Sequence, residues 1–371
     1  MRKILAVLLL FCMLLPAGLA VAMETPDVTA RAAVLLDQET GRILFSKNAH
    51  ERLPMASTTK IMTAILAIES GRLDEMVTVS EYASLVEGSG VDLDAGEQKT
   101  LEELLYGLML RSGNDAATAI AEHLAGSVEK FARQMTRRAG ELGAAQTRFE
   151  NPHGLEAENH YTTAYDLGII AVYAMSLPEF REVVATPEKR ISWTGRPYDR
   201  ILYNQNKLLD MYKYADGIKT GWTTPAGRCF VGSSNKDGWG LVAVVLNAPQ
   251  MWEDTIELME FGYSYYHWEP LVEEGRQLKS AQVERGTADR VTLVAGNDLG
   301  LPLKENEADV LRYEFNVAEP LRAPVSAGEE VGTMEVYFGT QRIAEVPLVA
   351  ASDVGRRGLF GALRNFFGRL F

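Results

Sequence analysis

The chain has 371 residues, of which 47% are hydrophobic and 23% are charged. This length and composition can form a large core and a second domain, which fits an enzyme and excludes a short binding peptide or a fibrous protein. The formal net charge of −13 argues against nucleic acid as a partner of the main body of the chain.

Residues 1–22 have the three parts of a signal peptide. A basic start is followed by an apolar run over 4–15 and by a small-residue cleavage site at 20–22. The apolar run is too short to span a bilayer comfortably. We therefore expect export, and a mature chain whose only cysteine is Cys229, so that no intrachain disulfide can form.

A predicted hairpin, formed by Ala33–Asp37 and Arg42–Ser46, precedes a Ser-Thr-Thr-Lys motif at Ser57–Lys60. Apolar residues at helical spacing follow the motif, so we expect Ser57 at the N-terminus of a buried helix. The spacing puts a hydroxyl and an amine one helical turn apart, and a neutral Lys60 in a partly desolvated pocket can take the proton of Ser57. The N–H groups at the helix start would favour an oxyanion. Alone, the motif fits an ordinary N-cap serine equally well.

A capping box at Thr100–Glu103 opens an apolar helix that we expect to run to Leu110. The second motif, Ser-Gly-Asn at Ser112–Asn114, follows in the loop at the end of this helix. Ser112 offers another hydroxyl that can relay protons, and Asn114 offers an amide that can hold a substrate backbone. Further helices are predicted over about 115–124, 127–142 and 162–175.

The third motif is Lys-Thr-Gly at Lys219–Gly221, which overlaps a predicted edge strand over Asp216–Thr220. Its cation and hydroxyl suit a substrate that ends in a carboxylate. Cys229–Gly232 and Leu241–Leu246 would be the neighbouring strands, and Glu253–Tyr266 a closing helix. We therefore predict an α/β fold: an antiparallel sheet flanked by helices, with a helical subdomain, in which the three motifs meet at the junction.

Each motif alone is a weak signal, because Ser-x-x-Lys also begins at Ser127 and at Ser233. Ser127 is better explained as a helix N-cap, and Ser233 leads into an Asp-Gly hairpin turn. Lys-Thr-Gly occurs once, and the order of all three motifs outlines an active-serine acyl-transfer site. The five histidines show no ligand spacing such as His-Glu-x-x-His, so we expect no metal and no other cofactor.

After Trp268 the sequence changes to short alternating segments separated by Gly, Pro and Asn-Asp turns. These segments predict a small β domain over 269–350, after a first domain over 23–268. Its predicted strands are Arg290–Val294, Asp309–Asn316, Gly332–Tyr337 and Ile343–Val349. No residue cluster there indicates chemistry, so the plainest interpretation is a spacer that lifts the first domain from a membrane.

The predicted tail over 351–371 differs in charge from the acidic chain, because Arg356–Phe371 contains four arginines and no acidic residue. As a helix it would carry its leucines and phenylalanines on one side. Such a helix would lie in the membrane interface and be attracted to anionic lipids, which would attach the exported protein peripherally to the outer face of the cytoplasmic membrane. The alternative is a helix docked on the protein itself or on a partner.

Four segments carry a resemblance to a known family: Met55–Thr63, Ser112–Ala116, Asn151–Leu155 and Asp216–Gly221. They are similar to the low-molecular-weight penicillin-binding proteins that are D-alanyl-D-alanine carboxypeptidases. The likeness extends over roughly residues 28–350, and the β domain and the tail follow in that family's order. The resemblance implies a β-lactamase/transpeptidase-like fold. It also implies a serine DD-peptidase that removes the terminal D-alanine of peptidoglycan stem peptides and is acylated by β-lactams.

The resemblance further implies a role for the residues of the first two motifs. Ser57 would be the acylated nucleophile, and Lys60 would be the general base for acylation. Ser112 would relay the proton to the leaving D-alanine, and Asn114 would hydrogen-bond the substrate amide.

By the same resemblance, Lys219 and Thr220 would hold the terminal carboxylate of the substrate, next to Gly221. The backbone N–H groups of Ser57 and Trp222 would form the oxyanion hole. His153 is a tempting second base, but its Pro-His-Gly context predicts a tight turn and a structural role.

Three other functions stay open at this point. A β-lactamase would need a group that activates water for fast deacylation, and turnover of nitrocefin would identify one. A DD-endopeptidase would share the chemistry and cleave crosslinked muropeptides. A non-catalytic wall-binding protein is disfavoured by the intact motifs, and labelling with a fluorescent penicillin would exclude it.

Overall fold

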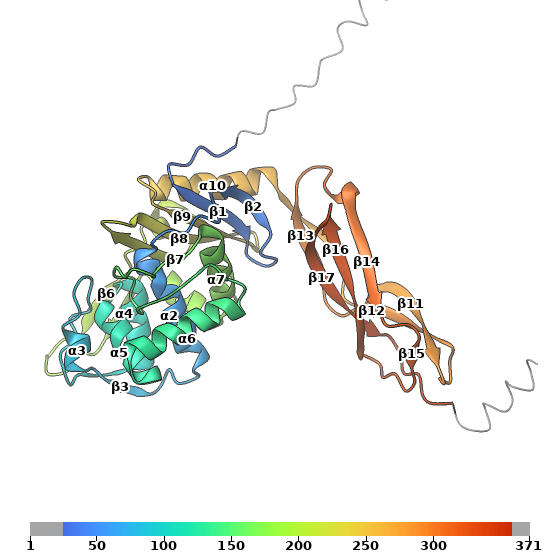
Figure 1. Ribbon diagram of the computed structural model, residues 1–371, viewed down its shortest axis with the longest axis horizontal. Coiled ribbons are helices and arrows are strands. Elements are labelled where there is room, and N and C mark those ends of the chain that lie inside the picture. Colours follow the sequence, from blue (N-terminus) through green and yellow to red (C-terminus); the bar gives the residue numbers. More distant parts are fainter. Residues whose placement is uncertain (1–24, 358–371) are drawn as a thin grey trace, which may run out of the picture.

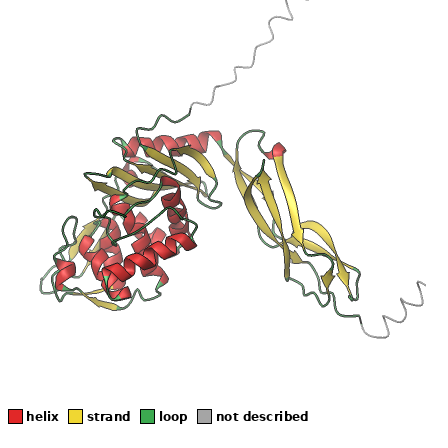
Figure 2. Ribbon diagram, in the orientation of Figure 1, coloured by secondary structure: helices red, strands yellow, loops and turns green. Residues whose placement is uncertain are grey.

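The structure is a computed structural model that describes residues 25–357 (Figure 1). An α/β domain is followed by a domain made almost entirely of strands, and helix α10 leads from the first into the second (Figure 2). The predicted signal peptide and residues 358–371 of the predicted tail lie outside the described residues.

A five-stranded antiparallel sheet forms the centre of the first domain, in the order β2-β1-β9-β8-β7. Its strands are β1 (Ala32–Asp37), β2 (Ile43–Lys47), β7 (Ala215–Thr223), β8 (Gly227–Lys236) and β9 (Trp239–Leu246). The predicted hairpin is therefore present as β1–β2. The Lys-Thr-Gly motif lies on an edge strand, as the sequence predicts.

The alternation of side chains along β1 decides what each face of the sheet packs against. Val34 and Leu36 belong to the core that contains α7 (Ala164–Ser176). Ala33 and Leu35 belong to the core that contains α10 (Met251–Tyr265). All four side chains are fully buried, so helices cover both faces of the sheet (Figure 1).

The rest of the first domain is mainly helical. Its helices are η2 (Ala56–Thr59, a 3₁₀ turn), α2 (Lys60–Glu69), α3 (Glu81–Ser84), α4 (Leu101–Leu110), α5 (Asn114–Ala125), α6 (Val128–Glu141), α8 (Pro178–Ala185) and α9 (Leu208–Met211). Two short antiparallel ribbons complete it, β3 (Met76–Thr78) with β4 (Gln98–Thr100), and β5 (Glu188–Ile191) with β6 (Arg200–Tyr203). The predicted capping box is present at the start of α4.

The α-helix after Ser57 begins later than the sequence predicts. Ser57 lies in the 3₁₀ turn η2, and α2 begins at Lys60. The hydroxyl groups of Thr58 and Thr59 donate to backbone carbonyls three residues back, at 2.6 and 2.8 Å. Such local bonds compete with the regular α-helical pattern, and they keep Ser57 in a tight, fixed turn.

The two other Ser-x-x-Lys matches have the structural roles predicted for them. Ser127 caps α6, where its hydroxyl accepts a hydrogen bond from the backbone N–H of Lys130. Ser233 lies in β8 and donates to Asp216 at 2.6 Å, and the chain turns from β8 into β9 after Lys236. Both serines therefore have structural roles, one at a helix N-terminus and one between two strands.

The second domain has a six-stranded sheet in the order β14-β16-β17-β12-β11-β15 and a two-stranded sheet of β10 and β13. Its elements are β10 (His267–Val272), β11 (Gln277–Glu284), β12 (Arg290–Ala295), β13 (Leu299–Leu303), η3 (Ala308–Val310), β14 (Leu311–Val317), β15 (Leu321–Arg322), β16 (Glu330–Phe338) and β17 (Gln341–Ala350). The four predicted strands are present as β12, β14, β16 and β17. Isolated bridges at Val354 and Arg356 continue the domain beyond its predicted boundary at residue 350.

Arg42 joins the two domains at the far edge of the sheet from β7. It hydrogen-bonds the backbone oxygen of Pro302 and pairs with Glu307 at 2.8 Å, and both partners belong to the second domain. Its guanidinium also lies over the ring of Tyr266, 5.7 Å from the centroid. Within residues 25–357, none of the helices is long and apolar enough to cross a membrane.

Candidate active site

Strand β7 and the turn η2 bring the first and third motifs together. A Cβ atom at Gly221 would lie 3.0 Å from the backbone nitrogen of Ser57 and 3.1 Å from the carbonyl oxygen of Met55. Contacts this short leave little room for a side chain, so the glycine lets the edge strand pass directly beside Ser57.

Lys60 is fully buried at the start of α2, just after the turn that carries Ser57. Its Nζ atom lies 3.0 Å from Oγ of Ser57 and 2.7 Å from Oδ1 of Asn114. The backbone oxygen of His153 is a third partner, at 2.7 Å. The first and second motifs therefore meet at one amine.

The surroundings of Lys60 lower its pKa well below the ordinary value of a lysine. Burial is the main cause, because the protein interior disfavours the charged amine, and the positive charge of Lys219 adds to the effect. The charge of Asp115 acts in the opposite direction on the pKa of Lys60. An amine that loses its proton readily can accept the proton of a hydroxyl 3.0 Å away, which is what general-base catalysis requires.

Ser112 and Asn114 lie where α4 ends and α5 begins. Ser112 has a left-handed backbone, with φ of 60°, and its buried Oγ atom has no hydrogen-bond partner among the described residues. A buried hydroxyl in this condition gains from bonding a group that enters the site. Asn114, in contrast, is held at both ends of its amide, because Oδ1 faces Lys60 and Nδ2 donates to the backbone oxygen of Glu87 at 2.6 Å.

Lys219 is 2% exposed, and its Nζ atom donates to the backbone oxygen of Thr220 at 3.1 Å. Burial lowers the pKa of Lys219 to about 7. An ammonium in such a place gains strongly from an incoming carboxylate, which restores the favourable interactions that water would supply. Thr220 is half-buried, and Trp222, two residues further along β7, is 66% exposed.

The segment Asn151–Leu155 packs against Lys60 and the turn η2. The side-chain oxygen of Asn151 accepts hydrogen bonds from the backbone N–H groups of His153 and Gly154, at 3.2 and 2.7 Å, which closes the tight turn that the sequence predicts. Gly154 has a φ of +94°, and a Cβ atom there would lie 1.9 Å from the carbonyl oxygen of Ala56. The turn is therefore pressed against η2.

Sequence reasoning misses the contact that His153 makes with Lys60, because it uses the backbone oxygen of His153. The ring of His153 accepts a hydrogen bond from the backbone N–H of Leu155 through Nδ1, at 3.2 Å. Burial, together with the charges of Lys60 and His160, lowers the pKa of His153 to about 3. Any residue type supplies a backbone oxygen, so the sequence cannot indicate this contact. It indicates only the tight turn, through the Pro-His-Gly segment.

The sequence profile of the D-alanyl-D-alanine carboxypeptidases, peptidase family S11, matches residues 19–250. The chain belongs to this family. A second profile, that of the C-terminal domain of penicillin-binding protein 5, matches residues 266–356.

Relatives are similar to this carboxypeptidase over nearly its whole length. The D-alanyl-D-alanine carboxypeptidase DacF of Bacillus subtilis is 32% identical, over 99% of this chain and 98% of its own. DacD of Escherichia coli is 30% identical over the same shares of the two chains. The crystal structure of penicillin-binding protein 5 from Haemophilus influenzae has a TM-score of 0.74 and 29% identity, and the match covers 89% of this chain and 99% of that one.

These matches confirm the predicted family and the predicted activity. The protein is a serine D-alanyl-D-alanine carboxypeptidase that acts on peptidoglycan, outside the cytoplasm. The predicted fold is confirmed for its two domains, a transpeptidase-like α/β domain and an all-β domain. Of the predicted C-terminal amphipathic helix, residues 358–371 lie outside the described residues, whereas Arg356 forms a β-bridge with Gly286.

Proposed function

We propose that this carboxypeptidase works through an acyl-enzyme on Ser57, with Lys60 as the general base. Neutral Lys60 takes the proton of the Ser57 hydroxyl as Oγ attacks the carbonyl carbon between the two terminal D-alanines. The bond to the terminal D-alanine then breaks, and water later hydrolyses the ester and frees Ser57. The observation that carries this proposal is the 3.0 Å distance between Nζ of Lys60 and Oγ of Ser57, at a fully buried amine.

Ser112 and Asn114 complete the acylation step in this proposal. Ser112 passes the proton from Lys60 to the amine of the leaving D-alanine, and its buried hydroxyl without a described partner supports this role. Asn114 holds the substrate through the second hydrogen of its Nδ2 atom, since the bond to Glu87 uses the first.

The Lys-Thr-Gly strand binds the substrate in this proposal. Lys219 and Thr220 hold the terminal carboxylate, and Gly221 lets the substrate and β7 approach Ser57. The backbone N–H groups of Ser57 and Trp222 bind the oxyanion of the tetrahedral intermediate. β-Lactams carry a carboxylate and a reactive carbonyl, so they acylate Ser57 in the same way.

We also propose how the rest of the chain serves this reaction. Residues 1–22 direct export, 23–268 form the peptidase domain and 269–350 form a spacer. The tail over 351–371 attaches the enzyme, through its residues beyond Arg357, to anionic lipid at the outer face of the cytoplasmic membrane. The concentration of arginines and phenylalanines in Arg356–Phe371 supports the attachment.

Labelling with a fluorescent penicillin, followed by mapping of the modified peptide, tests the site. The label is expected on Ser57 and is expected to disappear in Ser57→Ala, while Ser127→Ala and Ser233→Ala keep it. Labelling that persists in Ser57→Ala, or that maps to another serine, would overturn the assignment.

A further inference from the structure

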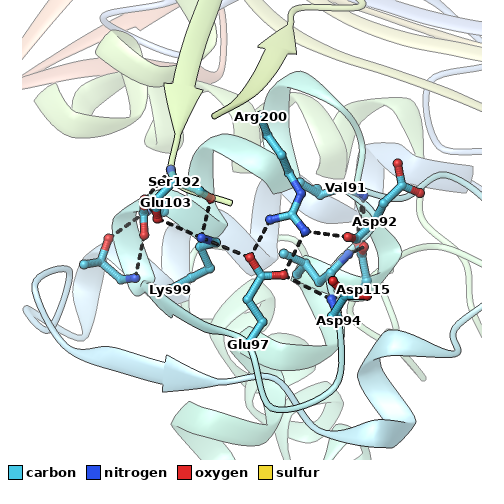
Figure 3. Close-up of polar contacts among 11 residues, drawn as sticks. Val91, Asp92, Asp94, Glu97, Lys99, Glu103, Asp115, Ser192 and Arg200 are labelled. Atoms are coloured by element: carbon cyan, nitrogen blue, oxygen red, sulfur yellow. Dashed lines mark hydrogen bonds and ion pairs between the residues drawn. The ribbon is translucent and has the colours of Figure 1, made fainter. Parts of the chain in front are cut away.

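A buried ion cluster formed by Glu97, Lys99 and Arg200 lies in the helical part of the first domain (Figure 3). The side chains are 1%, 0% and 4% exposed. Arg200 donates to both oxygens of Glu97, at 2.6 and 2.8 Å, and Nζ of Lys99 lies 3.1 Å from Oε1. Burial raises the pKa of Glu97, but the hydrogen bonds from Arg200, Asp94 and Lys99 and the charge of Arg200 outweigh it and bring the pKa to about 2. The carboxylate is therefore ionised at neutral pH.

Arg200 has a second partner that leads toward the active site. Its Nη2 atom donates to the backbone oxygen of Asp92 at 2.6 Å, next to the bond to Glu97 (Figure 3). Asp92 has a left-handed φ of 60°. The residues on either side of it, Val91 and Leu93, donate their backbone N–H groups to Asp115, at 2.9 and 3.2 Å. The same short piece of chain is thus held between Arg200 and Asp115.

Residues 87–89, at the other end of this segment (87–93), hold Asn114, the neighbour of Asp115. The backbone oxygen of Glu87 accepts from Nδ2 of Asn114 at 2.6 Å, and the backbone oxygen of Ser89 accepts from its backbone N–H at 2.7 Å. A Cβ atom at Gly88 would lie 2.7 Å from Nδ2 of Asn114, so the chain runs directly along the amide. The contact with Glu87 orients the amide and turns Oδ1 toward Lys60.

We propose that Arg200, held by Glu97, is a positioning residue for acylation, an inference that rests on the proposed roles of Lys60 and Asn114. It fixes the segment 87–93, and this segment fixes the amide of Asn114 against Lys60. The chemistry of the cluster supports the choice of arginine, because a planar guanidinium can bond a carboxylate and a carbonyl at set angles, whereas an ammonium is a point charge. Apolar residues can replace many buried ion pairs without loss of stability, so stability alone is a weak reason for three buried charges.

The test compares the full-length variants Arg200→Met, Arg200→Lys and Arg42→Met. Stopped flow measures the reaction of each with a fluorescent penicillin, at a temperature where each is folded. Arg200→Met is expected to lower the limiting rate of acylation about 10- to 100-fold, the scale of a small misplacement of catalytic groups. The half-saturating concentration is expected to stay close to that of the wild type, because the carboxylate is held by β7 rather than by the segment 87–93. Arg200→Lys keeps a charge for Glu97 and is expected to recover most of the thermal stability but only part of the rate.

Arg42→Met is the matched control, since Arg42 is also a largely buried arginine paired with a glutamate, but it lies beside β2, at the edge of the five-stranded sheet far from β7. It is expected to lower the thermal midpoint and leave the limiting rate of acylation unchanged. Two results would overturn the proposal. One is wild-type acylation by folded Arg200→Met. The other is a limiting rate of acylation that follows the thermal midpoint across all three variants, which would show that the cluster is purely structural. If Arg200→Met does not fold, Arg200→Lys keeps the test decisive.

Discussion

At the scale of single residues, the proposed mechanism depends on two buried lysines, Lys60 and Lys219. Burial lowers the pKa of each, to about 7 for Lys219, and the charge of Lys219 lowers the pKa of Lys60 further. A substrate carboxylate beside Lys219 favours its protonated form, which in turn keeps Lys60 neutral. In the proposed mechanism, substrate binding at Lys219 therefore keeps Lys60 ready to accept the proton of Ser57.

This division of labour predicts different effects for the two alanine variants. Lys60→Ala is expected to slow acylation by penicillin by roughly 10²–10⁴-fold, as loss of a general base does. Lys219→Ala is expected to weaken the reaction of ligands that carry a free carboxylate more than that of their methyl esters. The measurement is the acylation rate of each variant with both forms of one β-lactam, and equal losses on both forms would contradict the assignment.

Two histidines next to the site predict a loss of stability in acid. His160 accepts a hydrogen bond from the backbone N–H of Glu150 through Nδ1 and contacts Thr59 through Nε2, at 3.0 and 2.8 Å. Burial is the main cause that lowers the pKa of His153 to about 3 and of His160 to about 4. In the unfolded chain each histidine binds a proton below about pH 6.5, whereas in the folded chain it does not until the pH is far lower. The folded state therefore loses stability as the pH falls from 6.5 toward 4.

Denaturant unfolding at several pH values measures this effect. Each histidine is expected to contribute a slope of about 1.4 kcal/mol per pH unit between pH 6 and 4.5. His160→Gln keeps a donor for Thr59 and is expected to reduce the slope by one histidine's share. An unchanged slope in His160→Gln would show that the ring is already protonated in the folded protein.

At the scale of elements, the sequence predicts the long periodic segments and misses the short ones. β1, β8 and β9 carry apolar runs, and α4 carries a capping box, so each leaves a clear pattern. The ribbon β5–β6 and the strands β10 and β13 are missed, because strands of four to six residues are too short to show a periodicity of their own. The turn η2 is mistaken for the first turn of a helix, since two threonine hydroxyls decide its geometry.

The sequence likewise predicts one part of the candidate site and misses another. The sequence motifs identify Ser57, Lys60 and Asn114, which the structure brings into contact. The sequence does not identify the backbone oxygen of His153 or the segment 87–93, because their contribution comes from main-chain atoms that any residue type provides.

The contact between η2 and the turn at Gly154 gives a prediction for an element. Gly154→Ala places a side chain in a left-handed backbone and against the carbonyl oxygen of Ala56, so it is expected to destabilise the fold by at least the roughly 1–2 kcal/mol of a left-handed L-residue. Displacement of η2 is expected to reduce penicillin labelling of the folded fraction.

The control is Gly140→Ala, within α6, where a Cβ atom would meet nothing within 4 Å. It is expected to stabilise the protein by up to about 1 kcal/mol, because alanine favours the helix, and to leave labelling unchanged. Wild-type stability and labelling in Gly154→Ala would show that the turn and η2 do not depend on each other. Thermal unfolding and the labelling rate of both variants decide the question.

At the scale of the whole molecule, the carboxypeptidase combines an acidic body with a basic end. The chain has a formal net charge of −13, whereas Arg356–Phe371 has no acidic residue. Arg356 and Arg357 already bond the β domain, through the backbone oxygen of Ala323 and through Asp289. Attachment to a membrane would therefore depend on residues 358–371, which contain two further arginines and all of the tail's leucines and phenylalanines.

A chain that ends at Arg357 keeps the hydrogen bonds of the β domain and tests the role of the tail. The mature full-length enzyme is expected to bind vesicles of anionic lipid better than neutral ones, with about 1 kcal/mol from each arginine near the surface. High salt is expected to remove part of this binding, because it screens the charges and leaves the burial of the phenylalanines intact. The shortened chain carries only the acidic body, so it is expected to stay in solution and to react with penicillin at the full-length rate. Equal sedimentation of both chains with anionic vesicles would refute the anchor and favour a helix docked on the protein.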